Sequence, residues 1–174
     1  ANLAIKFGME VIGYDPFLSV NAAWSLDHNV KHAETLDAVY AKSDYITLHV
    51  PQTADTKGMI NAASIKNMKD GVRIINIARG GLINNTDILA ALESGKVACL
   101  VTDFAAEELL NKENVICLPH LGASTPEAED NCAVMAVNQL RDFLENGNIV
   151  IAVNFPKLVN EYPFTAGGTR ICIA

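Results

Sequence analysis

Apolar, β-branched runs recur along the chain, separated by segments whose apolar residues follow helical spacing. The clearest run lies at residues 72–77 (VRIINI), and four others share its character: residues 9–15, 45–50, 97–102 and 115–118. A continuous apolar run of this length fits a strand that is buried on both faces of a parallel sheet. Strands that alternate with helices favour right-handed crossovers. The pattern therefore predicts an α/β fold with a Rossmann-type, doubly wound parallel sheet, present here in part.

Four short segments have the spacing of helices, at residues 1–7, 33–43, 61–68 and 86–94. In the last of these, Thr86 is predicted to be the N-cap residue, because its hydroxyl can accept a hydrogen bond from the first turn. Residues 21–31 are mostly polar and are predicted to form a connection.

A longer helix is predicted to run from Pro126 to Gly147. Ser124 or Thr125 can cap it, and proline is favoured at the first helical position. One stripe of this helix is apolar and consists of Ala133, Val134, Val137, Leu140 and Leu144. Such a stripe indicates packing in a core or in a dimer interface.

Polar residues follow the predicted strands, at the edge where α/β sheets bind ligands. Arg79 precedes two glycines and can hold an anionic or carbonyl oxygen in its planar fork. His120 can move a proton near neutral pH, and a carboxylate against its other nitrogen would orient the ring. Asp103 and either Glu107 or Glu108 are the carboxylates at this edge. The pattern predicts acid/base chemistry beside a bound nucleotide.

The strand at residues 9–15 ends in Asp15, as does the second strand of a nucleotide-binding βαβ unit, whose carboxylate holds the adenosine ribose. A Gly-rich phosphate-binding loop is then expected just before Ala1. An aspartate between a strand and a proline is also common as a simple turn residue.

Composition narrows the partners and the compartment. The chain has 174 residues, of which 50% are hydrophobic, and a net charge of −7, which argues against nucleic acid and against an anionic membrane surface. A small molecule or a protein is the expected partner. No segment has the pattern of a signal peptide or of a membrane span, so a cytoplasmic location is expected. The four cysteines are isolated in sequence and are predicted to be reduced core residues, with no metal site.

Several motifs together resemble the D-isomer-specific 2-hydroxyacid dehydrogenases over essentially the whole chain. They are GYDP, HVPQTADTKGMIN, INIARGGLIN, TDFAAEE and LPHLGAST. The resemblance implies hydride transfer between a 2-hydroxy acid and NAD, with Arg79, Glu108 and His120 as the catalytic set. Leu109 stands where the usual motif has proline, and this departure leaves Glu107 as a rival to Glu108.

The same matching implies a set of residues that line NAD. They are Asp15, Val50, Ile77, Ala78, Arg79, Asp103, His120, Leu121, Gly122 and Ala123. Asp15 favours NAD over NADP, because its charge would repel a 2′-phosphate.

The resemblance also implies a division of the chain. Residues 1–120 would form an NAD-binding domain without its N-terminal βα unit, and residues 121–156 would lead back to a substrate domain. Residues 157–174 would be a linker and a truncated strand (TRICIA) of a regulatory ACT domain, the serine-sensing module of some family members. This tail is the reason to prefer phosphoglycerate over glycerate, lactate or hydroxypyruvate as substrate. A homodimer or homotetramer is expected, and a non-catalytic, NAD-sensing interaction protein is the alternative from another class.

Overall fold

The computed structural model describes residues 1–152 and 154–159, which belong to two compact units. The first unit is Ala1–Pro119, and the second begins at His120. The ACT-like strand expected at residues 169–174 lies outside the described residues.

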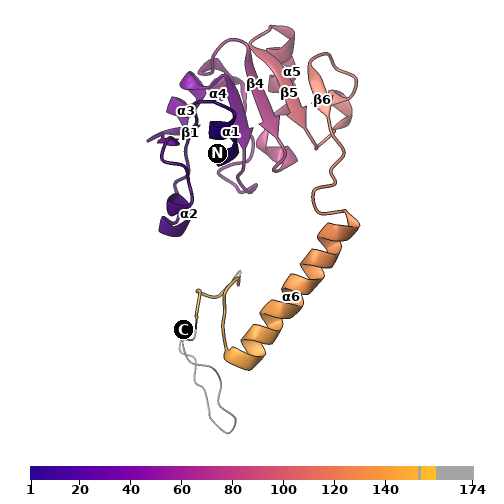
Figure 1. Cartoon of the computed structure of the whole chain (residues 1–174). Coiled ribbons are helices and arrows are strands. Elements are labelled where there is room, and N and C mark those ends of the chain that lie inside the picture. Colours follow the sequence, from indigo (N-terminus) through magenta and orange to yellow (C-terminus); the bar gives the residue numbers. More distant parts are fainter. Residues whose placement is uncertain (153, 160–174) are drawn as a thin grey trace. The chain divides into compact units, whose positions relative to one another are not determined.

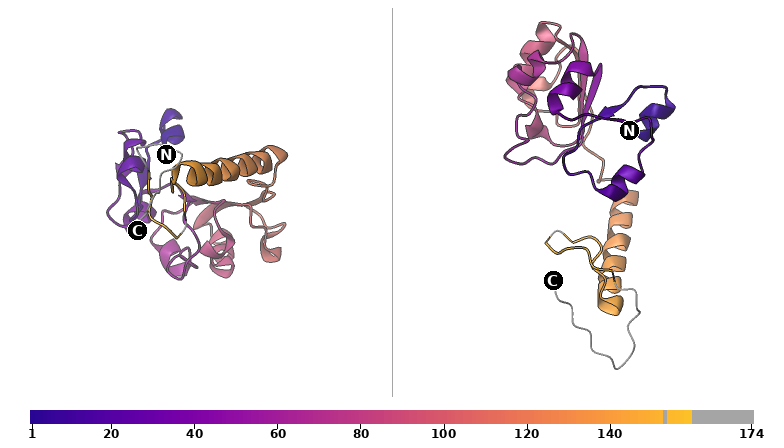
Figure 2. Two further views of the ribbon diagram at one scale, coloured as in Figure 1. Left: turned by 90° about the horizontal axis from the view of Figure 1, so that it is seen from below. Right: turned by 90° about the vertical axis from the view of Figure 1, so that its left-hand side faces the viewer.

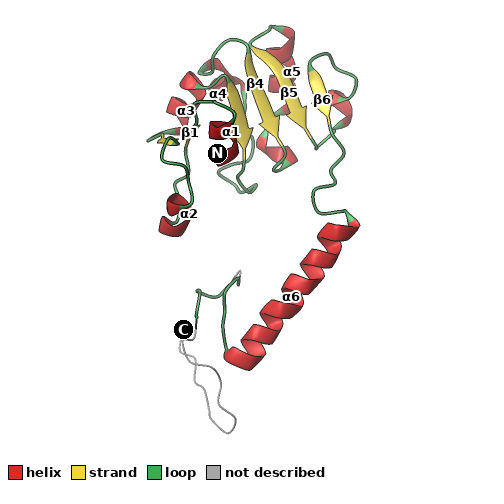
Figure 3. Ribbon diagram, viewed as in Figure 1, coloured by secondary structure: helices red, strands yellow, loops and turns green. Residues whose placement is uncertain are grey.

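A four-stranded parallel sheet forms the centre of the first unit (Figures 1 and 3). Its strands pair in chain order and are β3 (Tyr45–Leu48), β4 (Val72–Asn76), β5 (Val97–Thr102) and β6 (Val115–Cys117). Helix α4 (Ala62–Lys66) connects β3 to β4, and α5 (Asn85–Glu93) connects β4 to β5. Parallel neighbours require such crossovers, so the predicted Rossmann-type α/β fold is confirmed.

Two further strands form a small parallel sheet of their own, β1 (Ile12–Gly13) with β2 (Lys31–His32). Helices α1 (Asn2–Lys6) and α2 (Val20–Trp24) accompany them. The prediction for residues 21–31 was therefore wrong, because this segment holds most of α2 and the start of β2. Elements of two to five residues are too short to show a hydrophobic period.

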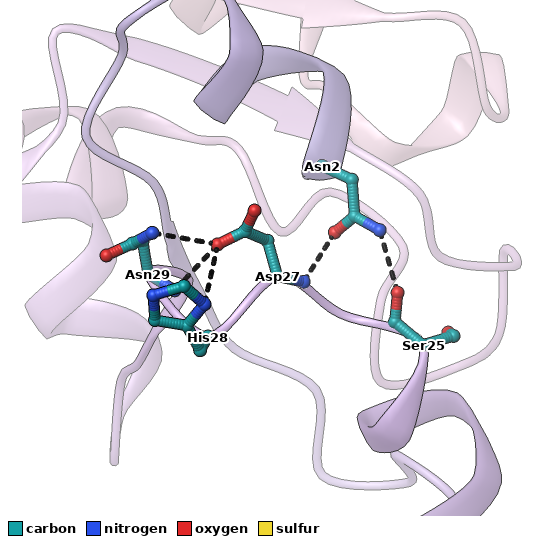
Figure 4. A network of polar contacts seen from close by, with 5 residues as sticks. All are labelled: Asn2, Ser25, Asp27, His28 and Asn29. Carbon is teal, nitrogen blue, oxygen red and sulfur yellow. Dashed lines mark hydrogen bonds and ion pairs between the residues drawn. The ribbon is translucent and has the colours of Figure 1, made fainter.

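Side-chain hydrogen bonds hold the start of α1 to the loop that precedes β2 (Figure 4). Asn2 donates to the Ser25 carbonyl at 2.7 Å, and its own oxygen accepts the Asp27 N–H at 2.8 Å. Asp27 in turn accepts hydrogen bonds from Asn29, which lower the pKa of its carboxyl group. This network joins residues 25 positions apart without a hydrophobic core.

The core of the first unit lies on one face of the four-stranded sheet. Along β4 the buried side chains are Val72, Ile74 and Asn76, whereas Arg73 points outward. Buried residues of α3 (Leu36–Lys42), α4 and α5 pack against this inner face. The expectation that β4 is buried on both faces was therefore wrong for the described residues, since the strand alternates as half-buried strands do.

The helix caps explain where the helices begin. Asn61 caps α4 and exchanges side-chain hydrogen bonds with Ser64. The cap of α5 is Asn84, whose side chain accepts the Asp87 N–H at 3.2 Å. The prediction of Thr86 as this cap was wrong. Both residue types can cap, and Asn84 stands two positions earlier, where its side chain reaches the first turn.

Tyr40 on α3 provides a test of the core. Its ring is buried, and its hydroxyl has no hydrogen-bond partner in the described part of the chain. We expect Tyr40→Phe to stabilise the protein by about 1 kcal/mol, because a buried unpaired polar group is costly. The measurement is urea unfolding, with the exposed Tyr45→Phe as a control. A less stable Tyr40→Phe would contradict the unpaired state of the hydroxyl.

The same residue limits stability at high pH. Burial, and then the charge of Asp37, raise the pKa of Tyr40 from 10.0 to about 12. The unfolded chain therefore loses this proton first, so the contribution of Tyr40 to stability is complete below pH 10 and disappears as the pH rises through about 12. In Tyr40→Phe this part of the alkaline loss should be missing.

The second unit contains the long helix α6 (Pro126–Asn146), which Figure 2 shows from two sides. Its predicted ends are confirmed, because Thr125 caps it and Gly147 follows it with φ 72°. The apolar stripe stays exposed, and so does Cys132, for which the prediction of a core position was wrong. Among the described residues, no helix has the length and apolar character to cross a membrane.

Candidate functional site

The four strands of the main sheet end at one level. Leu48 pairs with Asn76, Asn76 with Thr102, and Thr102 with Cys117. Residues that follow these partners therefore begin at a common edge, the carboxyl edge where α/β sheets bind ligands. Val50, the 77–79 loop and Asp103 all follow strands of this sheet, and His120 comes three residues after Cys117. Asp15 follows β1 in the smaller sheet.

Asn76 holds the loop that carries Arg79. Asn76 is 1% exposed. Its side-chain nitrogen donates to the Arg79 carbonyl at 2.9 Å, and its side-chain oxygen accepts the Ala78 N–H at 3.2 Å. The Arg79 guanidinium is exposed and donates to the Ala78 carbonyl at 2.7 Å. Sequence reasoning missed Asn76, although a polar residue that ends an apolar strand was a visible signal.

We expect Asn76→Asp to lower kcat/KM about tenfold for the hydride transfer that the resemblance implies. The change removes the donor to the Arg79 carbonyl and displaces the loop. It should also cost about 1–3 kcal/mol of stability, because a buried acceptor pair remains. Steady-state kinetics and urea unfolding measure both effects. Asn21→Asp makes the same chemical change at an exposed position and serves as the control. Equal behaviour of the two variants would contradict the role of Asn76.

Gly81 fixes the loop from the other side. Its N–H donates to the side-chain oxygen of Gln52 at 3.1 Å, and its carbonyl accepts the Gly58 N–H at 2.8 Å. A Cβ atom at position 81 would collide with the Gln52 side chain. A larger residue at position 81 would therefore force the end of the Gln52 side chain to move and would disturb its hydrogen bond with the Gly81 N–H.

A pocket of about 590 Å³ opens between the 80–86 segment and the 104–108 segment. Gly81, Asn85 and Glu108 are among the residues that line it, and Glu107 is not. Asn85 donates to Oε1 of Glu108 at 2.9 Å. This hydrogen bond, together with one from the backbone N–H of Glu108, lowers the pKa of the Glu108 carboxyl group. A low pKa keeps a carboxylate ionised, which is the state that supports a protonated imidazole.

The residues expected to line the cofactor have different environments. Asp103 is 8% exposed, Val50 and Ala78 are half-buried, and Ile77 is 54% exposed. Asp15 is exposed, and one of its oxygens accepts the Phe17 N–H at 2.8 Å. This bond fixes the carboxylate after β1 and leaves its other oxygen to accept from ribose hydroxyls. A carboxylate acceptor at this position fits a nucleotide whose ribose carries free hydroxyl groups.

The remaining predicted site residues lie in the second unit. His120 is its first residue and is exposed, as are Leu121, Gly122 and Ala123. The Ser124 N–H donates to the Leu121 carbonyl at 3.1 Å and closes a turn before α6. The structure thus brings Arg79, Asp103 and Glu108 to one edge of the first unit, and His120 lies in the second unit.

Parallel strands, crossover helices and a carboxylate after β1 define an α/β dinucleotide-binding domain. Residues 1–122 match the family model described as "D-isomer specific 2-hydroxyacid dehydrogenase, NAD binding domain". The chain therefore belongs to the NAD-dependent D-isomer-specific 2-hydroxyacid dehydrogenase family, and its cofactor is NAD.

Relatives of known name agree with this family. The chain is 38% identical over 164 residues to D-3-phosphoglycerate dehydrogenase of Synechocystis, covering 91% of this chain and 29% of the relative. It is 38% identical over 167 residues to the protein of the same name in Bacillus subtilis, covering 92% and 31%. D-lactate dehydrogenase of Lactiplantibacillus pentosus is 37% identical over 169 residues, covering 86% and 50%. The chain thus spans half or less of these relatives.

Solved structures with the same fold include a glyoxylate reductase from Paecilomyes thermophila, with a TM-score of 0.74 and 32% identity over 87% of this chain and 47% of that one. Another is apo D-lactate dehydrogenase from Escherichia coli, with a TM-score of 0.67 and 28% identity over 82% and 45%.

Proposed function

We propose that the protein oxidises D-3-phosphoglycerate to 3-phosphohydroxypyruvate with NAD, a first step towards serine. The observation that carries the proposal is the common level of the strand ends, which puts Arg79 and Glu108 at one edge of an NAD-binding sheet. The choice of substrate is supported by the names of the two relatives at 38% identity. The proposal includes a homodimer or homotetramer in the cytoplasm.

In this proposal NAD supplies the hydride acceptor for the hydrogen on C2 of the substrate. Arg79 binds the substrate carboxylate and the C2 oxygen in its fork. His120 takes the hydroxyl proton as the C2–H bond breaks, and it returns that proton when the reaction runs as reduction. Glu108 orients the imidazole and stabilises its protonated form. Glu108 is favoured over Glu107 for this role, because Glu108 lines the pocket and accepts the hydrogen bond from Asn85.

Two alternative functions can be set against this proposal, and the comparisons support one of them. A D-lactate dehydrogenase and a glyoxylate reductase are also similar to this chain, which favours a non-phosphorylated 2-hydroxy acid as the second candidate substrate. A non-catalytic, NAD-sensing interaction protein would keep the residues that bind NAD at the carboxyl edge of the sheet, but it would not need Arg79, Glu108 and His120 together.

The decisive experiment follows NADH oxidation by the intact gene product with 3-phosphohydroxypyruvate, pyruvate, hydroxypyruvate and glyoxylate, each with and without serine. Preference for the phosphorylated acid supports the proposal, and inhibition by serine supports a regulatory ACT-like segment. If another acid is preferred, the family assignment stands and the proposed substrate is wrong. If none is reduced while NADH still binds, the sensing function replaces the catalytic one.

A further inference from the structure

We propose that Asn85 is a positioning residue, which holds the Glu108 carboxylate in the orientation that Glu108 needs to act on His120. The inference rests on the proposed function, and it adds a residue that the motif matching does not include. The contact that carries it is the 2.9 Å hydrogen bond from Asn85 Nδ2 to Glu108 Oε1.

The donor side of this bond is rigidly placed. Asn85 is the first residue of α5 and is half-buried. Next to it, Asn84 caps the helix, and the Asp87 side chain accepts the Ala62 N–H at 2.9 Å. Ile88, one turn further along, is 0% exposed. The Asn85 side chain therefore projects from a helix end that is fixed by a cap, by a bond to α4 and by the core.

The acceptor side is held at its backbone. Glu108 lies in the short 3-10 helix η2 (Glu107–Leu109), which packs against α5. Leu109 is 3% exposed, and its N–H donates to the Ala106 carbonyl at 2.9 Å. The Glu108 side chain itself is exposed, so the amide of Asn85 restricts a carboxylate that would otherwise rotate freely. Within residues 1–152 and 154–159 the hydrogen bond to the Glu108 side chain is accepted by Oε1, and Oε2 is the oxygen that we assign to an imidazole N–H.

The Asn85 amide is the main influence on the pKa of Glu108. The neighbouring elements carry Asp87 and Glu93 on α5, Glu107 on η2 and Arg79 on the adjacent loop. The pKa of Glu108 is nevertheless lowered mainly by the Asn85 hydrogen bond and then by its own backbone N–H. Loss of the amide should therefore raise this pKa towards the ordinary value of 4.5.

The first measurement is a carbon-13 NMR titration of the Glu108 carboxyl group in the intact gene product, for the wild type and for Asn85→Ala. We expect Glu108 to titrate below 4.5 in the wild type and closer to 4.5 in the variant. Asn67→Ala is the matched control, because Asn67 donates to the Asp37 carboxylate at 3.4 Å beyond the end of α4. An unchanged Glu108 titration in Asn85→Ala would overturn the proposal.

The second measurement is the pH profile of 2-keto acid reduction. An ionised and oriented Glu108 favours protonated His120, so Asn85→Ala should lose activity at a lower pH than the wild type. The shift should be in the same direction as in Glu108→Gln and smaller. We expect kcat to fall about tenfold with the KM for NADH unchanged. Asn85→Gln, which keeps the amide donor on a longer side chain, should recover part of the loss.

The outcomes separate this inference from the proposed function. If the wild type reduces none of the acids, the proposed function fails, and the positioning role fails with it even where the NMR shift is present. If the wild type is active and Glu108→Gln moves the pH profile while Asn85→Ala does not, the inference alone is overturned. A shifted titration together with a shifted profile supports both.

Discussion

Replacing His120 with glutamine should lower kcat for reduction of the preferred 2-keto acid by about 10²–10⁴-fold, the usual contribution of a positioned acid/base group. Glutamine can still donate a hydrogen bond, but it cannot release or accept a proton near neutral pH. The substrate carboxylate is assigned to Arg79 and the ribose to Asp15, so binding of NADH should change little. Steady-state kinetics and fluorescence titration with NADH measure the two effects.

His28→Gln is the matched control for this prediction. The side chain of His28 is 90% exposed and lies beside Asp27 in the loop before β2, a strand of the smaller sheet. Its substitution should leave kcat unchanged. If His120→Gln retained most of its turnover, the proton would have to move through another group, and the role assigned to Glu108 would lose its partner.

The edge that carries the site could be predicted from the sequence because it depends on strand order and direction alone. Apolar runs that end in Asn76-Ile77-Ala78-Arg79 and in Thr102-Asp103 predict parallel strands, and parallel strands share a carboxyl edge. The register confirms it, with Asn76 opposite Thr102.

The contacts that shape the site could not be predicted in this way. Asn85 and Glu108 are 23 residues apart, and Gln52 and Gly81 are 29 residues apart. Each contact therefore depends on how distant segments of the chain fold together. The spacing of apolar residues predicts helices and strands, but it does not predict such contacts. The family motifs imply chemistry for Arg79, Glu108 and His120, but they imply no role for the neutral amides that contact these segments, even where Gln52 and Asn76 lie inside a motif.

The burial of β4 shows a second limit. Its β-branched residues Val72, Ile74 and Ile75 favoured a strand covered on both faces, yet Arg73 already marked the outward side. In the structure the Arg73 guanidinium lies 5.2 Å from the centre of the Tyr45 ring, on the face opposite the core. Side chains along a strand alternate between its two faces, so one charged residue in the alternating pattern indicates the exposed face better than the number of apolar residues around it.

Arg79→Lys should lower kcat/KM for the preferred acid by about 10- to 100-fold. A hydrogen bond to a charged group contributes about 1.5–3 kcal/mol, and each 1.4 kcal/mol is about tenfold in rate. Lysine keeps the positive charge but has a single ammonium group, which cannot hold a carboxylate oxygen and the C2 oxygen in one plane. Part of the loss should appear in kcat, because the C2 oxygen gains charge as the hydride moves during reduction.

Arg73→Lys is the control, because it makes the same chemical change at an exposed position near the start of β4. It should leave kcat/KM unchanged, since Arg73 is the second residue of β4, whereas Arg79 follows the other end of the strand. If Arg79→Lys retained wild-type kcat/KM, only a positive charge would be needed at position 79. The hydrogen bonds between the Asn76 side chain and the backbone of residues 78–79 would then support the loop without orienting a guanidinium group. The geometry of the fork would no longer explain why the chain fixes this loop so closely.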